Sequence, residues 1–222
     1  MPARNDDLHG MVPDTCDVAL VLLDVINDMQ FDGAERLLPH AVRSAERIAE
    51  LKRRVAAAGI PVVYVNDNFG RWRSDFRALI RHTLEAETPG REIARMLLPA
   101  EEDYFVLKPK HSGFFSSTLD VLLTYLKVKT LIIAGFAGDI CVLFTASDAY
   151  MRDYRLMVPS DCVASEDPEE NRRALEKMAR VLRADTTPSA ELDLERLRRH
   201  ARSSEREQPE GPSADLPRDS TA

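Results

Sequence analysis

Apolar residues occur along the chain in short, nearly continuous runs, and each run is followed by a longer segment with apolar residues at helical spacing. The run that begins at Asp17, DVALVLLDV, is rich in Val and Leu, which is typical of a strand buried on both faces of a parallel sheet. Residues 38–55 then have the periodicity of an amphipathic crossover helix, with Pro39 near its start and Gly59 after its end. A second strand is predicted at 61–65.

The same alternation continues to about residue 187. Further strands are predicted in DYFVLK, TLIIAGF and YRLMVPS and at 183–186, and helices in TLDVLLTYLKV, CVLFTASDAYM and PEENRRALEKMARVL. This order predicts an α/β fold: a doubly wound, mostly parallel six-stranded sheet with helices on both faces, in three α/β/α layers. Residues 66–100 fit the alternation poorly, since they mix aromatics and arginines with Pro89 and Gly90. We interpret them as an irregular lobe or lid.

The chain is predicted to hold one folded domain. We assign residues 1–16 to an N-terminal extension, 17–188 to the α/β domain, and 189–222 to a C-terminal helix and tail. The last 20 residues contain three apolar residues and three prolines, so we expect them to be disordered.

Composition excludes several classes of protein. The 222 residues carry a formal net charge of −7, which disfavours a nucleic-acid partner. No apolar run approaches the ~20 residues that span a bilayer, and the first ten residues lack the apolar stretch of a signal peptide. We therefore expect no membrane association and a cytoplasmic location. The three cysteines contain no CxxC pair, so neither a disulfide framework nor a zinc cluster is indicated.

Asp24, Lys108 and Cys141 each follow or end a predicted strand, at the sheet edge where α/β proteins bind ligands. The predicted helix start at Cys141 would lower the thiol pKa and create a nucleophile. Burial would raise the pKa of Asp24, as a general acid/base requires, and Lys108 would add a fixed charge. Taken singly, each residue has an ordinary reading: a buried small hydrophobe, a turn cap or a surface cation. Their shared position at one edge of the sheet favours a joint catalytic role.

Three segments resemble the isochorismatase-like cysteine hydrolases: LLDV with ND after it, VLKPKHSGFFSSTL, and IIAGFAGDICVLFTASDAYMRDYRLMVPSDCVAS. The likeness extends from about residue 17 to 187. It implies a catalytic triad of Asp24, Lys108 and Cys141 and a cis peptide bond between Phe136 and Ala137. It also implies an oxyanion hole made by the amides of Ala137 and Cys141, and a homo-oligomer.

The resemblance implies a cysteine hydrolase that cleaves a carbon–nitrogen bond of a small amide or carbamoyl compound through a thioester acyl-enzyme. The presence of Cys141 favours this reaction over vinyl ether hydrolysis, which needs no thiol. An isochorismatase-type vinyl ether hydrolase stays open, as does a non-catalytic thiol- or ligand-binding protein of the same fold.

Nicotinamidases in the family hold a metal through an Asp-x-His unit after the second strand. Here Asp67 is followed by Asn68 and Phe69, so we expect no metal or other cofactor, and a pocket or turn role for Asp67. His82 and His111 are expected to stay out of reach of the crevice. Four residues are our candidates for binding the small-molecule substrate: Asn68, Trp72, Phe114 and Phe136.

Overall fold

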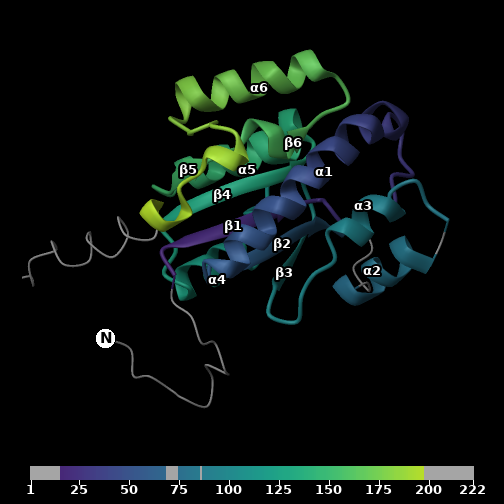
Figure 1. The fold of residues 1–222 in the computed structure, drawn as a ribbon, viewed down its shortest axis with the longest axis horizontal. Coiled ribbons are helices and arrows are strands. Elements are labelled where there is room, and N and C mark those ends of the chain that lie inside the picture. The colour runs from purple at the N-terminus through teal and green to yellow at the C-terminus, as the bar shows by residue number, and fades with distance from the viewer. Residues whose placement is uncertain (1–15, 69–74, 86, 198–222) are drawn as a thin grey trace, which may run out of the picture.

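The computed structural model of the protein describes residues 16–68, 75–85 and 87–197 (Figure 1). Most of the predicted N-terminal extension, the predicted tail and the candidate residue Trp72 lie outside the described residues.

The core of the fold is a six-stranded sheet in which every pairing is parallel. The strand order is β3-β2-β1-β4-β5, with β6 beside the end of β4. The central strands β1 and β4 are buried along their whole length, as their apolar runs predict. The strands are β1 Val18–Leu23, β2 Val62–Asp67, β3 Tyr104–Lys108, β4 Thr130–Phe136, β5 Arg155–Met157 and β6 Val163–Ala164.

Helices cover both faces of the sheet, which confirms the predicted three-layer α/β/α fold (Figure 1). The alternation of side chains along β1 divides the core in two. Leu20 and Leu22 pack in the layer that contains α1, α2 and α3, whereas Val21 and Leu23 pack in the layer of α4, α5 and α6. The helices are α1 Ala34–Ala57, α2 Phe76–Glu85, α3 Arg91–Met96, α4 Leu119–Tyr125, α5 Leu143–Tyr150 and α6 Pro168–Val181.

The sixth strand is not where the sequence places it. The predicted strand at 183–186 contributes a single bridge, between Asp185 and Met157, because Arg183 has a φ of 55° and interrupts the extended backbone. The sixth strand is instead β6, whose two residues are too few to stand out as an apolar run. The C-terminal helix predicted after residue 188 begins as a 3₁₀ turn at Ser189–Glu191, followed by a helical turn at 194–197.

The lobe at 66–100 contains two helices, α2 and α3, where the sequence suggests irregular structure. It packs onto the loop that follows β1. A Cβ atom on Gly90 would lie 1.8 Å from the carbonyl oxygen of Asn27, and the Gly90 N–H donates to the Asp28 carbonyl at 3.2 Å. His82 Nε2, in this lobe, lies 3.1 Å from Asp28 Oδ2 on the same loop.

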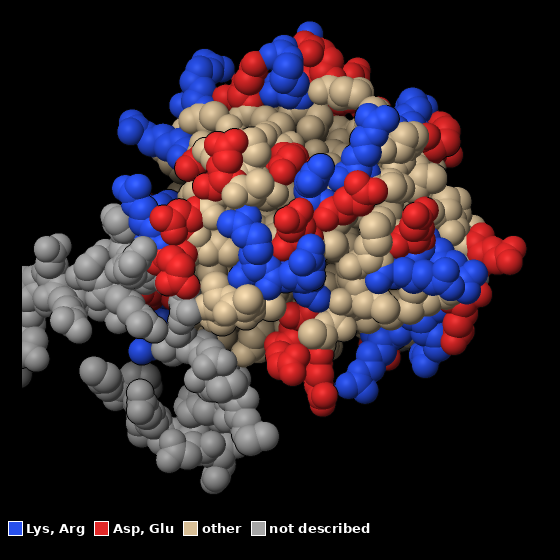
Figure 2. All heavy atoms as spheres, viewed as in Figure 1, with Lys and Arg blue, Asp and Glu red and all other residues tan. Residues whose placement is uncertain are grey.

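None of the helices in the described ranges is long and apolar enough to cross a membrane. On the face shown in Figure 2, acidic and basic side chains of the described residues are interspersed. This mixed surface differs from the clustered cations that bind a phosphate backbone.

Candidate active site

The three residues that the resemblance singles out meet at the carboxyl end of the sheet. Asp24 directly follows β1, and its N–H donates to the Val65 carbonyl of β2 at 3.0 Å. Lys108 is the last residue of β3 and pairs in register with Asp67, the last residue of β2. Cys141 lies in a π-helical turn, Gly138–Val142, between β4 and α5. Parallel strands therefore deliver all of these side chains to one edge.

The Lys108 ammonium is the centre of the site. Its Nζ lies 2.8 Å from Asp24 Oδ2, 3.7 Å from Cys141 Sγ and 3.6 Å from Asp67 Oδ2. Lys108 has no exposed surface, and the side chain of Asp24 is 8% exposed. The reading of Lys108 as a surface cation is therefore wrong, because a lysine is buried in this way only when opposite charges surround it.

Burial and neighbouring charges have opposite effects on the pKa values of Asp24 and Lys108. Burial raises the pKa of Asp24 above its ordinary value, although Lys108 opposes that shift. Burial also works against a charged Lys108, but Asp24, Cys141 and Asp67 outweigh it and raise the pKa of the ammonium. The site therefore combines a stable cation with a carboxylate that binds a proton more readily than an exposed one.

The Cys141 thiol differs from the sequence expectation. Burial, followed by the charge of Asp24, raises its pKa to about 12, although Lys108 and the Ala137 N–H act against this shift. The prediction that the helix start lowers the pKa is wrong, because desolvation outweighs the local dipoles at this depth. The resting residue is a protonated thiol, which needs a base before it can attack.

The turn that carries Cys141 depends on a close approach of β1 and β4. A Cβ atom on Gly135 would lie 2.1 Å from the Leu23 carbonyl oxygen, so only glycine fits there. The peptide bond between Phe136 and Ala137, just after Gly135, is cis, as the resemblance implies. The Ala137 N–H is hydrogen-bonded to the Cys141 thiol, and the Ala137 carbonyl accepts from the Val142 N–H at 3.0 Å.

Two hydrogen bonds that the sequence analysis missed join the segment after Lys108 to helix α5. Ser112 Oγ donates to Asp148 Oδ2, and the Gly113 N–H donates to Thr145 Oγ1 at 2.9 Å. Both acceptors belong to the TASDA segment, which closely follows Cys141. These bonds fix the strand end that carries Lys108 relative to the helix that follows Cys141.

The candidate substrate-binding residues lie in different environments. Asn68 directly follows β2, at the edge where Lys108 lies, and its N–H donates to the Lys108 carbonyl at 2.9 Å. Phe136 and Phe114 are buried in opposite core layers. The Phe114 ring lies against the Arg152 guanidinium, 4.7 Å from its carbon to the ring centre. This packing favours a core role for both phenylalanines.

Possible metal ligands are dispersed. In the ranges 16–68, 75–85 and 87–197, no group of three or more His, Cys, Asp or Glu side chains is arranged to hold a metal ion. His82 pairs with Asp28, and the His111 ring lies 5.7 Å from the ring of Phe144.

Comparison with known proteins identifies the family to which the chain belongs. The model of the Isochorismatase domain family matches residues 18–190. The chain belongs to the isochorismatase family. It is 39% identical to the uncharacterized isochorismatase family protein YaaI of Bacillus subtilis, over 79% of this chain and 96% of that protein.

Two further relatives are named for the reactions that they catalyse. Ureidoacrylate amidohydrolase RutB of Azorhizobium caulinodans is 26% identical, over 78% of this chain and 86% of that protein. The crystal structure of N-carbamoylsarcosine amidase from Thermoplasma acidophilum superposes with a TM-score of 0.62 and 28% identity, over 80% of this chain and 99% of that one. This protein is thus an isochorismatase-family hydrolase whose relatives include amidohydrolases.

Proposed function

We propose that the protein is a cysteine hydrolase that cleaves a carbon–nitrogen bond of a small amide or carbamoyl compound through a thioester acyl-enzyme. The observation that carries the proposal is the buried contact of one ammonium, Lys108, with both the carboxylate of Asp24 and the thiol of Cys141. An acid/base and a nucleophile that share one buried cation are the groups that acyl transfer needs. The amidase and ureidoacrylate amidohydrolase relatives support the same bond type.

The first step is attack by Cys141 on the substrate carbonyl. Because the thiol pKa is raised to about 12, the proton must move to a base as the sulfur attacks. Asp24 is hydrogen-bonded to this thiol and accepts the proton. The carbon–sulfur bond forms, and the carbonyl electron pair moves to oxygen. The amides of Ala137 and Cys141 then stabilise the oxyanion, with the Ala137 N–H already directed at the thiol.

The second step expels the nitrogen. The oxyanion reforms a carbonyl, the carbon–nitrogen bond breaks, and the proton held by Asp24 passes to the departing amine or ammonia. Asp24 is then a carboxylate again and accepts a proton from the water that attacks the thioester. The thioester sulfur leaves and recovers this proton, which releases the acid product and restores the thiol. Lys108 supplies positive charge beside sulfur and carboxylate throughout.

The test is a screen of small amides, carbamates and ureides for ammonia release, with intact-protein mass spectrometry on each active compound. We expect a covalent adduct of acyl mass on Cys141 and none on the Cys141→Ala variant. Cys162 is a matched control, because burial raises the pKa of this thiol to about 12 as well, while the polar groups that act on it are Ser189, Asp161 and Arg47. Cys162→Ala should retain turnover and adduct.

Isochorismate belongs in the same screen. Hydrolysis of its vinyl ether without ammonia release, at an equal rate in wild type and Cys141→Ala, would contradict the proposal and favour the vinyl ether hydrolase. A protein that turns over nothing and forms no adduct would favour the non-catalytic thiol or ligand-binding role.

A further inference from the structure

We propose that Asp67 is a positioning residue for this reaction: its carboxylate keeps the Lys108 ammonium protonated and seated between Asp24 and Cys141 while Asp24 carries the thiol proton. The inference rests on the proposed function and adds a fourth side chain to the machinery. It replaces the pocket or turn role that the sequence suggests for Asp67.

The backbone brings Asp67 into contact with two members of the site. Asp67 Oδ2 lies 3.6 Å from Lys108 Nζ, and the two residues pair in register where β2 and β3 end. The Asp67 N–H donates to Asp24 Oδ1 at 2.7 Å. That bond holds one oxygen of Asp24 and leaves the other, Oδ2, at 2.8 Å from the ammonium. Asp67 therefore orients Asp24 through its backbone and faces Lys108 with its side chain.

Charge balance during the reaction gives the Asp67 carboxylate its role. In the resting site two carboxylates contact the buried cation. When Cys141 attacks, Asp24 takes up the thiol proton and loses its negative charge, while the neutral sulfur enters a covalent bond. Among the described residues, Asp67 is then the one carboxylate still in contact with Lys108. A buried ammonium without a counter-charge tends to lose its proton.

The exposure of Asp67 sets the expected size of its effect. Its side chain is 29% exposed, against none for Lys108 and 8% for Asp24. Its attraction raises the pKa of Lys108, but less than the attraction of Asp24 or Cys141 does. Solvent reduces but does not remove such an interaction, because one partner is fully buried. We therefore expect a moderate effect that depends on pH, not a loss of all activity.

The decisive experiment is titration of the Lys108 side chain by NMR in protein labelled with ¹³C-lysine, with Lys108→Arg to assign the signal. Asp67→Asn keeps the backbone N–H and the size of the side chain but removes its charge. We expect the pKa of Lys108 to fall by about one unit, which is tenfold in the deprotonated fraction. The alkaline limb of kcat should move to lower pH by the same amount, with little change in KM.

The matched control is Asp28→Asn. Asp28 is a carboxylate on the neighbouring loop that pairs with His82 and not with Lys108. It should leave the Lys108 titration unchanged. Asp67→Glu, which retains the charge, should recover most of the wild-type titration and pH profile. Melting temperatures of all three variants verify that the fold is intact. If Asp67→Asn does not fold, Asp67→Ser is a second variant that removes the charge.

An unchanged Lys108 titration in Asp67→Asn and Asp67→Ser would overturn the inference whatever the activity. A rise in KM alone, without a shift of the alkaline limb, would make Asp67 a substrate anchor and also overturn it. The NMR titration needs no substrate. Absence of turnover in the unmodified enzyme would therefore count against the proposed function. An unchanged Lys108 pKa in the Asp67 variants would count against the positioning role of Asp67.

Discussion

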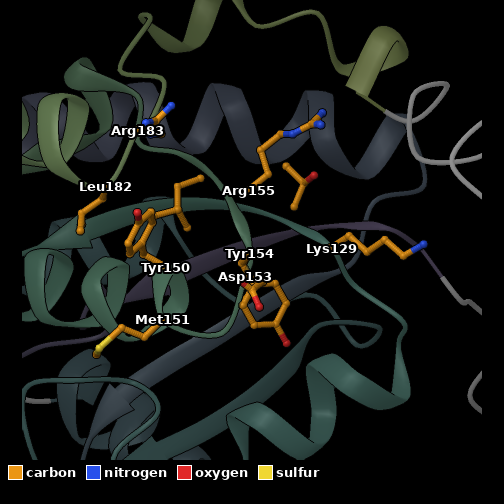
Figure 3. A pocket seen from close by; sticks show the side chains of 10 residues that line it. Lys129, Tyr150, Met151, Asp153, Tyr154, Arg155, Leu182 and Arg183 are labelled. Carbon is orange, nitrogen blue, oxygen red and sulfur yellow. The ribbon is translucent and has the colours of Figure 1, made fainter.

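The two ends of the sheet differ in both shape and chemistry. At the amino end, a groove of about 700 Å³ lies between the start of β4 and β5 and the ends of α5 and α6 (Figure 3). Its charged residues are exposed and spread along it: Lys129, Asp153, Arg155 and Arg183. At the carboxyl end, Asp24 and Lys108 are buried in contact with each other and with Cys141. The amino end, with its groove, therefore holds separate, solvated charges, whereas the carboxyl end holds buried charges in contact.

This difference shows that cavity size alone does not identify the candidate catalytic site in this protein. Exposed charges interact weakly, because water and salt screen them over about 8–10 Å. Buried charges in contact shift one another's pKa and so can move protons during a reaction. The carboxyl end is where substitutions should change turnover, and the amino end is where they should not.

The largest effect is expected at the nucleophile. Cys141→Ala and Cys141→Ser should each reduce turnover by about 10⁴-fold or more, because neither side chain forms the thioester. Steady-state rates on a substrate found by the screen, with circular dichroism to verify folding, provide the measurement. Turnover near the wild-type rate in either variant would remove Cys141 from the mechanism.

The next largest effect concerns the two charged residues. Asp24→Asn and Lys108→Met should each lower kcat by at least ~100-fold, the size expected for loss of a positioned proton carrier or a key charge. A change confined to KM would identify the residue as a substrate anchor. Lys108→Met should also retain the aliphatic packing of the buried side chain, so its melting temperature separates chemistry from folding.

The same two variants should move the pKa of Cys141 in opposite directions. The Asp24 charge raises this pKa and the Lys108 charge lowers it, with burial as the largest cause. Asp24→Asn should therefore bring the pKa below about 12, and Lys108→Met should raise it further. A pH titration of the ultraviolet absorbance of the thiolate, corrected with Cys141→Ala, measures both. Shifts of the same sign would mean that the two charges do not act on the sulfur as the geometry indicates.

The smallest effect is expected at the amino end. Arg155→Ala and Lys129→Ala should change the free energy of unfolding by no more than ~0.5 kcal/mol, because exposed side chains make few contacts. Neither should change kcat or KM. Denaturant unfolding and steady-state kinetics test this, and a loss of activity in either variant would show that the two ends of the sheet are coupled.

Much of the fold was predictable because burial leaves a clear pattern. The run DVALVLLDV predicts β1, and TLIIAGF predicts β4 with its bounds correct. The prediction failed where the elements were short or depended on distant contacts. Two residues make up β6, and the lobe that includes α2 and α3 is held by contacts such as that of Gly90 with the loop at Asn27.

The sequence by itself determined the fold class and the placement of Asp24, Lys108 and Cys141, since residues that end or closely follow buried parallel strands lie at the carboxyl edge of the sheet. Only the tertiary structure decided their protonation. The thiol pKa rises to about 12 because the packed site removes water from the sulfur, and this desolvation depends on every element that closes over it. The contact of Asp67 with Lys108 was also undecided, because it follows from the pairing of β2 with β3, residues that are 41 positions apart in the chain.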